Sequence, residues 1–85
     1  MKIQAEVSLY PLRTKKIAQI VNSFCAKLTQ ENLVVKPGAM STQITGDIGD
    51  VFESLENAFI VSAEKHDVIL TVKFSNTCLA EVENT

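Results

Sequence analysis

Residues 40–59, MSTQITGDIGDVFESLENAF, combine the pattern of a β-strand with the pattern of an α-helix. The first six residues alternate bulky and polar side chains, which is the period of a strand. Gly46 and Asp47 are expected to stop this strand, and either Asp47 or Asp50 can cap the helix that follows. The stretch therefore predicts a strand that leads directly into a helix. The apolar stripe of that helix comprises Val51, Phe52, Leu55, Ala58, Phe59 and Ser62.

The flanking sequence supplies three more strands and one more helix. Pro11 lacks an amide hydrogen and is expected to end the first strand, and Thr14 is the candidate cap of the first helix. The turn between the middle strands is expected at Pro37 and Gly38. The predicted elements, from apolar alternation or helical spacing, are strands at 2–10, 33–36, 40–45 and 68–75 and helices at 15–30 and from about 48 to 65 or 66.

This order, β-α-β-β-α-β, is the split βαβ arrangement. It predicts an α+β, ferredoxin-like fold in which two helices cover one face of a four-stranded antiparallel sheet. The length of 85 residues suits one small domain. We expect residues 1–78 to form this single ligand-binding domain, followed by a short C-terminal tail at residues 79–85.

The two faces of the predicted sheet differ in character. The first and last strands each carry one apolar stripe, which suits packing on the helices, whereas the opposite face is a mixture that includes Tyr10 and Ile69. A semi-polar face of this kind commonly stacks on another sheet, so we predict a homodimer or homotetramer. Glu6, also on this face, either pairs with a lysine such as Lys73 across the sheet or lines a site.

The composition is that of an ordinary globular protein, with 46% hydrophobic and 21% charged residues. No apolar run approaches the ~20 residues needed to cross a bilayer, and the N-terminus alternates where a signal peptide would be continuously apolar. We therefore expect a soluble, cytoplasmic protein with no membrane partner. The net charge of -2, with scattered lysines, disfavours nucleic acid as a partner.

Side chains suited to catalysis are few. His66 is the single histidine, and the two cysteines, Cys25 and Cys78, lack metal-ligand spacing. No glycine motif matches a nucleotide-binding loop. We therefore expect no enzyme activity, no catalytic residues, no metal and no cofactor. Cys25 lies on the apolar stripe of the first helix, where a small hydrophobe is the favoured interpretation and a reactive thiol the alternative.

Thr42 does not fit the apolar pattern of its strand. Alternation places it in register with Met40 and Ile44, hence on the covered face if those two residues are in the core. A hydroxyl there needs a hydrogen-bond partner. That partner is either a backbone carbonyl or a small polar ligand that enters between the sheet and a helix. Polar side chains on the opposite register are Ser41, Gln43 and Thr45.

Two motifs in this chain resemble those of a known family. The first is EVSLYPL at residues 6–12, a strand that ends in S-x-Y-P and precedes a helix. The second is PGAMSTQITGD at residues 37–47, which contains M-S-T-x-x-x-G-D and leads into a helix. From residue 3 to about residue 74 the chain is similar to the thiamine/hydroxymethylpyrimidine-binding (YkoF-like) domain family, in a single-domain version.

The resemblance implies a ferredoxin-like domain that binds thiamine or its hydroxymethylpyrimidine moiety without chemical change. Because tandem relatives carry two copies, it also implies self-association here. Two alternatives are an oligomeric regulatory or interaction domain that senses another metabolite, and an enzyme subunit whose chemistry comes from elsewhere. Tyr10 would stack on a ring, with Met40 or Phe52 as apolar wall. The matching positions imply as ligand-binding residues Ser8, Tyr10, Met40, Ser41, Thr42, Gln43, Asp47 and Phe52.

Overall fold

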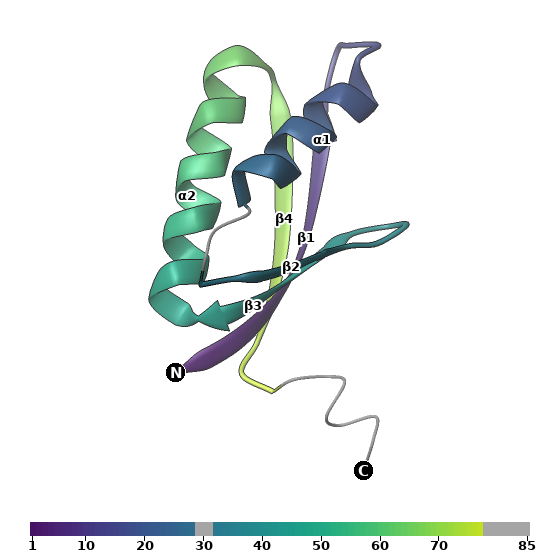
Figure 1. The fold of residues 1–85 in the computed structure, drawn as a ribbon. Coiled ribbons are helices and arrows are strands. Elements are labelled where there is room, and N and C mark those ends of the chain that lie inside the picture. The colour runs from purple at the N-terminus through teal and green to yellow at the C-terminus, as the bar shows by residue number, and fades with distance from the viewer. Residues whose placement is uncertain (29–31, 78–85) are drawn as a thin grey trace.

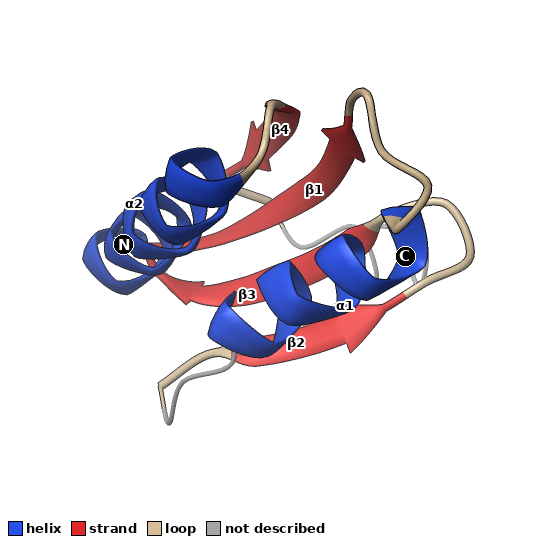
Figure 2. Ribbon diagram, turned by 90° about the horizontal axis from the view of Figure 1, so that it is seen from above, coloured by secondary structure: helices blue, strands red, loops and turns tan. Residues whose placement is uncertain are grey.

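The computed structural model describes residues 1–28 and 32–77. Their strands form one antiparallel sheet in the order β2-β3-β1-β4, and both helices lie on the same face of it (Figure 1, Figure 2). The predicted α+β, ferredoxin-like fold is confirmed. The elements are β1 (Lys2–Pro11), α1 (Ile17–Leu28), β2 (Val34–Pro37), β3 (Thr42–Asp47), α2 (Ile48–Lys65) and β4 (Val68–Ser75).

The core lies between the helices and the central strands β1 and β3. Both helices bury apolar side chains at spacings of three or four, as an amphipathic helix on a sheet requires. β4 is an edge strand, so its inward side chains at 68, 70 and 72 are only half-buried. The buried apolar residues are Ile3, Ala5, Val7, Leu9, Ile20, Phe24, Leu28, Leu33, Ile44, Val51, Leu55 and Ala58.

A buried polar contact joins the two helices. The hydroxyl of Ser54, on α2, donates to the carbonyl of Leu28, the last residue of α1, over 3.0 Å. The final carbonyls of a helix have no partner within the helix, so this bond satisfies one of them in a dry environment. α1 and α2 therefore meet with the C-terminal end of α1 against the first half of α2.

The turn between β2 and β3 differs from the sequence prediction. The amide of Gly38 donates to the carbonyl of Ser41 over 2.8 Å, so residues 38–41 form a closed turn and β3 begins only at Thr42. Met40 therefore lies outside the strand and is 91% exposed, and the expectation that it shares the covered face with Thr42 was wrong. A Cβ on Gly38 would lie 2.8 Å from the carbonyl oxygen of Ser41, which explains the glycine.

The junction of β3 with α2 also differs from the prediction. Gly46 and Asp47 were expected to stop the strand, but both pair with β1, because Ile3 and Lys2 lie opposite them. Asp47 occupies the N-cap position of α2 without a side-chain cap hydrogen bond. The amide of Ile48 donates instead to the carbonyl of Met1, at 2.9 Å. The start of α2 is thus tied to the N-terminus by backbone.

Two of the apolar side chains predicted for the inner face of α2 are not buried. Phe52 and Phe59 are partly exposed, whereas Ser54 occupies an inward position. Phe52 stacks on Phe74 of β4, with ring centroids 4.6 Å apart and an interplanar angle of 6°. Because β4 is the sheet edge, this pair lies at the margin of the core. The spacing of apolar residues predicted Phe52 as a core residue because it lies at the border of the apolar stripe of α2.

The remaining boundaries agree with the predictions within a few residues. The first strand includes Pro11, which pairs with Val68 as its last residue. The hydroxyl of Thr14 accepts a hydrogen bond from the amide of Lys16 over 3.1 Å, just before α1 rather than within its first turn. The predicted end of the first helix near residue 30 and the tail at 79–85 lie outside the described residues.

Candidate functional site

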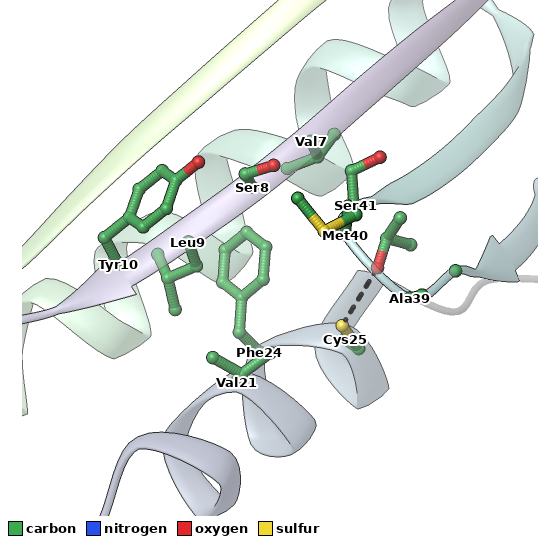
Figure 3. A pocket seen from close by; sticks show the side chains of 12 residues that line it. Val7, Ser8, Leu9, Tyr10, Val21, Phe24, Cys25, Ala39, Met40 and Ser41 are labelled. Atoms are coloured by element: carbon green, nitrogen blue, oxygen red, sulfur yellow. Dashed lines mark hydrogen bonds between the residues drawn. The ribbon is translucent and has the colours of Figure 1, made fainter.

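A cavity of about 130 Å³ lies where β1 extends beyond β3. The last pair between these strands joins Val7 to Thr42, whereas β1 continues to Pro11 beside β4. The turn at 38–41 forms one side of the resulting gap, and α1 covers it (Figure 3). The residues that line the cavity are Val7, Ser8, Leu9, Tyr10, Val21, Phe24, Cys25, Gly38, Ala39, Met40, Ser41 and Thr42.

The position of the cavity explains why side chains from both faces of β1 line it. Val7 and Leu9 belong to the buried face, and Ser8 and Tyr10 to the open face. In the middle of the sheet these two sets would be separated by the neighbouring strand. Here β3 no longer flanks β1, so residues 8–11 have no strand partner on that side within the described chain. An unpaired strand edge offers amide donors and carbonyl acceptors to a ligand.

The hydroxyl of Thr42 forms a hydrogen bond with the thiol of Cys25. The two atoms, Oγ1 and Sγ, are 3.4 Å apart, and either can be the donor (Figure 3). Thr42 is 8% exposed and Cys25 is half-buried, so the contact forms part of the cavity wall. The partner of the Thr42 hydroxyl is thus a side chain of α1, not the backbone carbonyl that was one of the two expectations. Because sulfur is a weak hydrogen-bonding partner, this hydroxyl can exchange it for a stronger one.

The cavity has hydrogen-bonding groups but no charge. Its polar side chains are the hydroxyls of Ser8, Tyr10, Ser41 and Thr42 and the thiol of Cys25, and no acidic or basic residue of the described part of the chain lines it. Its apolar surface comes mainly from Phe24 and Leu9, both of them buried, and Val21. Met40, exposed at the rim, adds a flexible apolar side chain. An uncharged, partly aromatic wall with several hydroxyls suits a neutral heterocycle better than an ion.

The end of β1 that lines the cavity is held in place from the other side. The guanidinium of Arg13 pairs with the carboxylate of Asp67 at 3.0 Å, and the amide of Leu12 donates to the carbonyl of Asp67 at 2.8 Å. Arg13 has a φ of 55°, an unusual backbone conformation that these two contacts help to hold. The loop after β1 is therefore attached to the start of β4, which leaves the other edge of β1 free for the cavity.

Five of the eight residues proposed from the sequence line this one cavity, namely Ser8, Tyr10, Met40, Ser41 and Thr42. They come from segments about thirty residues apart, and the register of β1 with β3 brings them together. The lining residues that were not proposed from the sequence belong to β1, to α1 and to the turn, namely Val7, Leu9, Val21, Phe24, Cys25, Gly38 and Ala39. Helical spacing placed the α1 residues on an inward face, but it carried no information about which strand they would meet.

The other three proposed residues lie elsewhere. Gln43 is on the open face of the sheet, where its Oε1 accepts from the Nε2 of Gln4 at 3.5 Å. Asp47 lies at the other end of β3, with a carboxylate oxygen 4.0 Å from the N-terminal amine. Phe52 lies at the margin of the core, stacked on Phe74. The structure does not bring these three side chains to the cavity.

Of the two alternatives for Glu6, the structure shows the pair across the sheet, because the Nζ of Lys73 lies 3.9 Å from a carboxylate oxygen of Glu6. Within residues 1–28 and 32–77, no group of three or more histidine, cysteine or acidic side chains is placed to hold a metal ion. None of the described helices is both long and apolar enough to cross a membrane.

Comparisons with known proteins agree with this fold. The model of the YKOF-related family matches residues 2–81. A search of curated protein sequences finds no match. A crystal structure of a hypothetical protein from Methanocaldococcus jannascii superposes with a TM-score of 0.82 at 23% identity, covering 98% of this chain and 94% of that one.

Two further crystal structures are similar at lower sequence identity. A Streptococcus pneumoniae protein has a TM-score of 0.85 at 16% identity, with 99% of this chain and 96% of that chain covered. A Thermotoga maritima protein, provisionally assigned to thiamine biosynthesis or salvage, has a TM-score of 0.83 at 10% identity, with 99% and 98% covered. At these identities the three structures establish the shared fold alone.

Proposed function

Because the chain belongs to the YKOF-related family, as its two motifs indicated, we propose that it binds thiamine or the hydroxymethylpyrimidine moiety of thiamine, without chemical change and as a homo-oligomer. The observation that supports this proposal is the cavity at the end of β1. Its described lining combines four hydroxyls and a thiol with apolar side chains and has no charged group. The provisional assignment of the Thermotoga maritima protein to thiamine metabolism points in the same direction.

The chemistry of the cavity suits an aminopyrimidine. Such a ring presents donors and acceptors along its edge and two apolar faces. Hydroxyls can both donate and accept, so Ser41 and Thr42 can bond to ring nitrogens as well as to the amino group. Tyr10 and Phe24 offer aromatic surface for the faces of the ring. The free edge of β1 adds backbone donors and acceptors.

The size of the cavity indicates which part of thiamine it would hold. Its volume of about 130 Å³ is below the roughly 300–1,000 Å³ typical of pockets that enclose a whole ligand. We infer that the pyrimidine enters and that the cationic thiazolium stays at the mouth, where it remains hydrated. The absence of a lining carboxylate agrees with this orientation, because a buried cation would require a partner charge.

A second copy of the chain would complete the site from the open face of the sheet. Tyr10, which lines the cavity, also lies on this face and is 52% exposed. Its partner across the sheet is Ile69, which is 49% exposed, and Val34 on the other edge strand is similarly exposed. Burial of these apolar side chains against the same face of another copy would stabilise a dimer and narrow the mouth of the cavity.

The placement of the reactive side chains supports binding without catalysis. Cys25 is bonded to Thr42, and no acidic or basic side chain lines the cavity with it. His66 follows α2 and lines a different hollow, between the helices. A thiol nucleophile or a hydroxyl nucleophile needs an adjacent base to be activated. The cavity itself provides none.

Isothermal titration calorimetry with ligand fragments tests this proposal. Thiamine and hydroxymethylpyrimidine should both release or absorb heat and raise the melting temperature, whereas the isolated thiazole alcohol should do neither. A pyrimidine with oxygen in place of the amino group should bind more weakly. If neither thiamine nor hydroxymethylpyrimidine gives heat or a thermal shift at millimolar concentration, the proposal fails. The alternative of an oligomeric domain that senses another metabolite would then be the better one.

A further inference from the structure

A second hollow, of about 380 Å³, lies between the two helices. Its walls come from one face of α1, which includes Gln19 and Ser23, and from the C-terminal end of α2. Val21, Phe24 and Cys25, which line the cavity at the end of β1, lie on a different face of α1. The helix thus separates the two hollows, and we refer to the second as the interhelical groove.

The groove gathers positive charge in a chain that is acidic overall. Lys16, Lys27 and Lys65 line it together with His66, and none of the aspartates and glutamates within residues 1–28 and 32–77 does. The ion pairs formed among the described residues use Arg13, Lys73 and the N-terminal amine instead. Three of the eight lysines and arginines therefore line one hollow, although the formal net charge is -2.

Helix electrostatics account for only part of this cluster. Lys65 and Lys27 lie in the last turns of their helices, where a cation is favourable. Lys16 immediately precedes the N-terminus of α1, where a cation is unfavourable, and the first turn of α1 contains no acidic residue to offset it. A positive charge at this position is explained if the groove holds an anion.

Ser62 places a hydrogen-bond donor in the groove. It is 8% exposed and lines the groove, and its hydroxyl forms no hydrogen bond with residues 1–28 and 32–77. Among these residues no side-chain oxygen is both fully buried and unpartnered, so solvent reaches this hydroxyl from the groove. Ser54, the other buried serine of α2, satisfies its hydroxyl at the carbonyl of Leu28. A hydroxyl that solvent reaches and that has no protein partner can donate to a ligand oxygen. The Ser62 hydroxyl is therefore available to a ligand in the groove, in exchange for water.

We propose that the interhelical groove binds the phosphate group of a small phosphorylated ligand. Lys16 and Lys65 would supply charge, and His66 and Ser62 would donate hydrogen bonds to phosphate oxygens. A phosphate has several strong acceptor oxygens and carries up to two charges, so it can use three or four donors at once. This site does not depend on the thiamine proposal, because it uses none of the residues of that cavity.

The geometry of the helices places the phosphate at one end of the groove. The contact of Ser54 with Leu28 and the lining residues show that α1 and α2 run in opposite directions, with Lys16 beside the end of α2. Lys27 lies eleven residues further along α1, about 16 Å away at the rise of an α-helix. One phosphate cannot reach both lysines. The remainder of the ligand would therefore extend along the groove toward Lys27, past Ser23.

Titration of the protein with inorganic phosphate and with methyl phosphate, followed by two-dimensional NMR at constant ionic strength, tests this proposal. Saturable shifts should be confined to the amides around Lys16, Ser62 and His66. Lys16→Gln should weaken binding about tenfold, the loss expected for one charge-assisted hydrogen bond. Lys15→Gln is the matched control, because it removes the same charge one residue away, outside the groove. Solvent and salt screen that charge, so the control should change the affinity by no more than about twofold.

Ser62→Ala separates a ligand role from a structural one. The serine hydroxyl has no described protein partner and alanine is the better helix former, so the melting temperature should stay the same or rise. The affinity for phosphate should nevertheless fall about fivefold. Three results would each overturn the proposal: no saturable shift at about 20 mM phosphate, equal losses in Lys15→Gln and Lys16→Gln, or unchanged affinity in folded Ser62→Ala.

Discussion

Replacing Thr42 by valine should weaken ligand binding while it leaves the fold nearly as stable as before. Valine keeps the branched shape and exchanges the hydroxyl for a methyl group. The bond that is lost joins Oγ1 to the Cys25 sulfur at 3.4 Å, so its net contribution lies near or below the about 0.5 kcal/mol that marks the weak end for neutral hydrogen bonds. The added methyl, at a position only 8% exposed, contributes about 0.8 kcal/mol. The free energy of unfolding should therefore change by less than about 1 kcal/mol.

The effect of the same change on binding should be larger. If the hydroxyl of Thr42 turns from Cys25 to the pyrimidine, valine leaves a polar group of the ligand without a partner in a dry cavity. That loss costs about 1–3 kcal/mol, which corresponds to roughly 5- to 150-fold weaker affinity. Calorimetry with hydroxymethylpyrimidine measures the affinity, and urea unfolding followed by circular dichroism measures the stability.

Thr42→Ser is the matched control for this experiment. Serine keeps the hydroxyl and removes the methyl, so it should bind within about twofold of wild type while it loses about 1 kcal/mol of stability. The two variants thus have opposite profiles. A folded Thr42→Val protein that binds as tightly as wild type would refute the assignment of this hydroxyl to the ligand. Equal loss of affinity in both variants would show that packing, not the hydroxyl, is what the ligand requires.

Three further changes test the core, the cavity and the open face. Ser54→Ala should cost about 1–3 kcal/mol in urea unfolding, because it leaves the carbonyl of Leu28 buried without its partner. In a Cys78→Ser background, hydroxymethylpyrimidine should slow the labelling of Cys25 by a maleimide, because this thiol lines the cavity. Ile69→Lys should dissociate the proposed oligomer in light scattering, because it places a charge beside Tyr10 among the exposed apolar side chains of the open face.

Controls from exposed positions of the two helices accompany these changes. Ser23→Ala removes an exposed hydroxyl from α1 and should alter stability by no more than about 0.5 kcal/mol, so an equal effect at Ser54 would contradict the role of its bond. Asn57→Lys, on α2, adds the same charge on the helix side of the molecule and should leave the oligomer intact. Labelling of Cys25 at the same rate with and without ligand would place the binding site elsewhere.

Most of the fold was predictable from the periodicity of apolar residues. Alternation with period two and spacings of three and four identified every strand and helix in the right order, and the β-α-β-β-α-β order determined the topology of the sheet. These signals are local, since each depends on which face of a single element is apolar. They also placed Glu6 and Lys73 on the open face, where the structure shows the ion pair that was one of two alternatives for Glu6. At the edge of an apolar stripe, as at Phe52, the spacing does not indicate whether the side chain is covered by the sheet or exposed.

The candidate site was only partly predictable from the sequence. The sequence singled out Thr42 because a hydroxyl interrupts an apolar register, and its resemblance to a family added Ser8, Tyr10 and Ser41. Neither source could identify Cys25 as the partner of Thr42, because the contact depends on how α1 lies across the sheet. The same applies to the exposure of Met40, which follows from the closed turn at 38–41.

By itself, then, the sequence determined the elements, their faces and the family, since these follow from neighbouring residues along one strand or helix. Only the tertiary structure decided where β3 stops beside β1. The overhang of β1 past Val7 creates the cavity, and the antiparallel packing of α1 on α2 creates the interhelical groove. Both depend on register and on the placement of elements relative to one another. Those are relations between distant segments, which the packing of the whole core sets and no local pattern records.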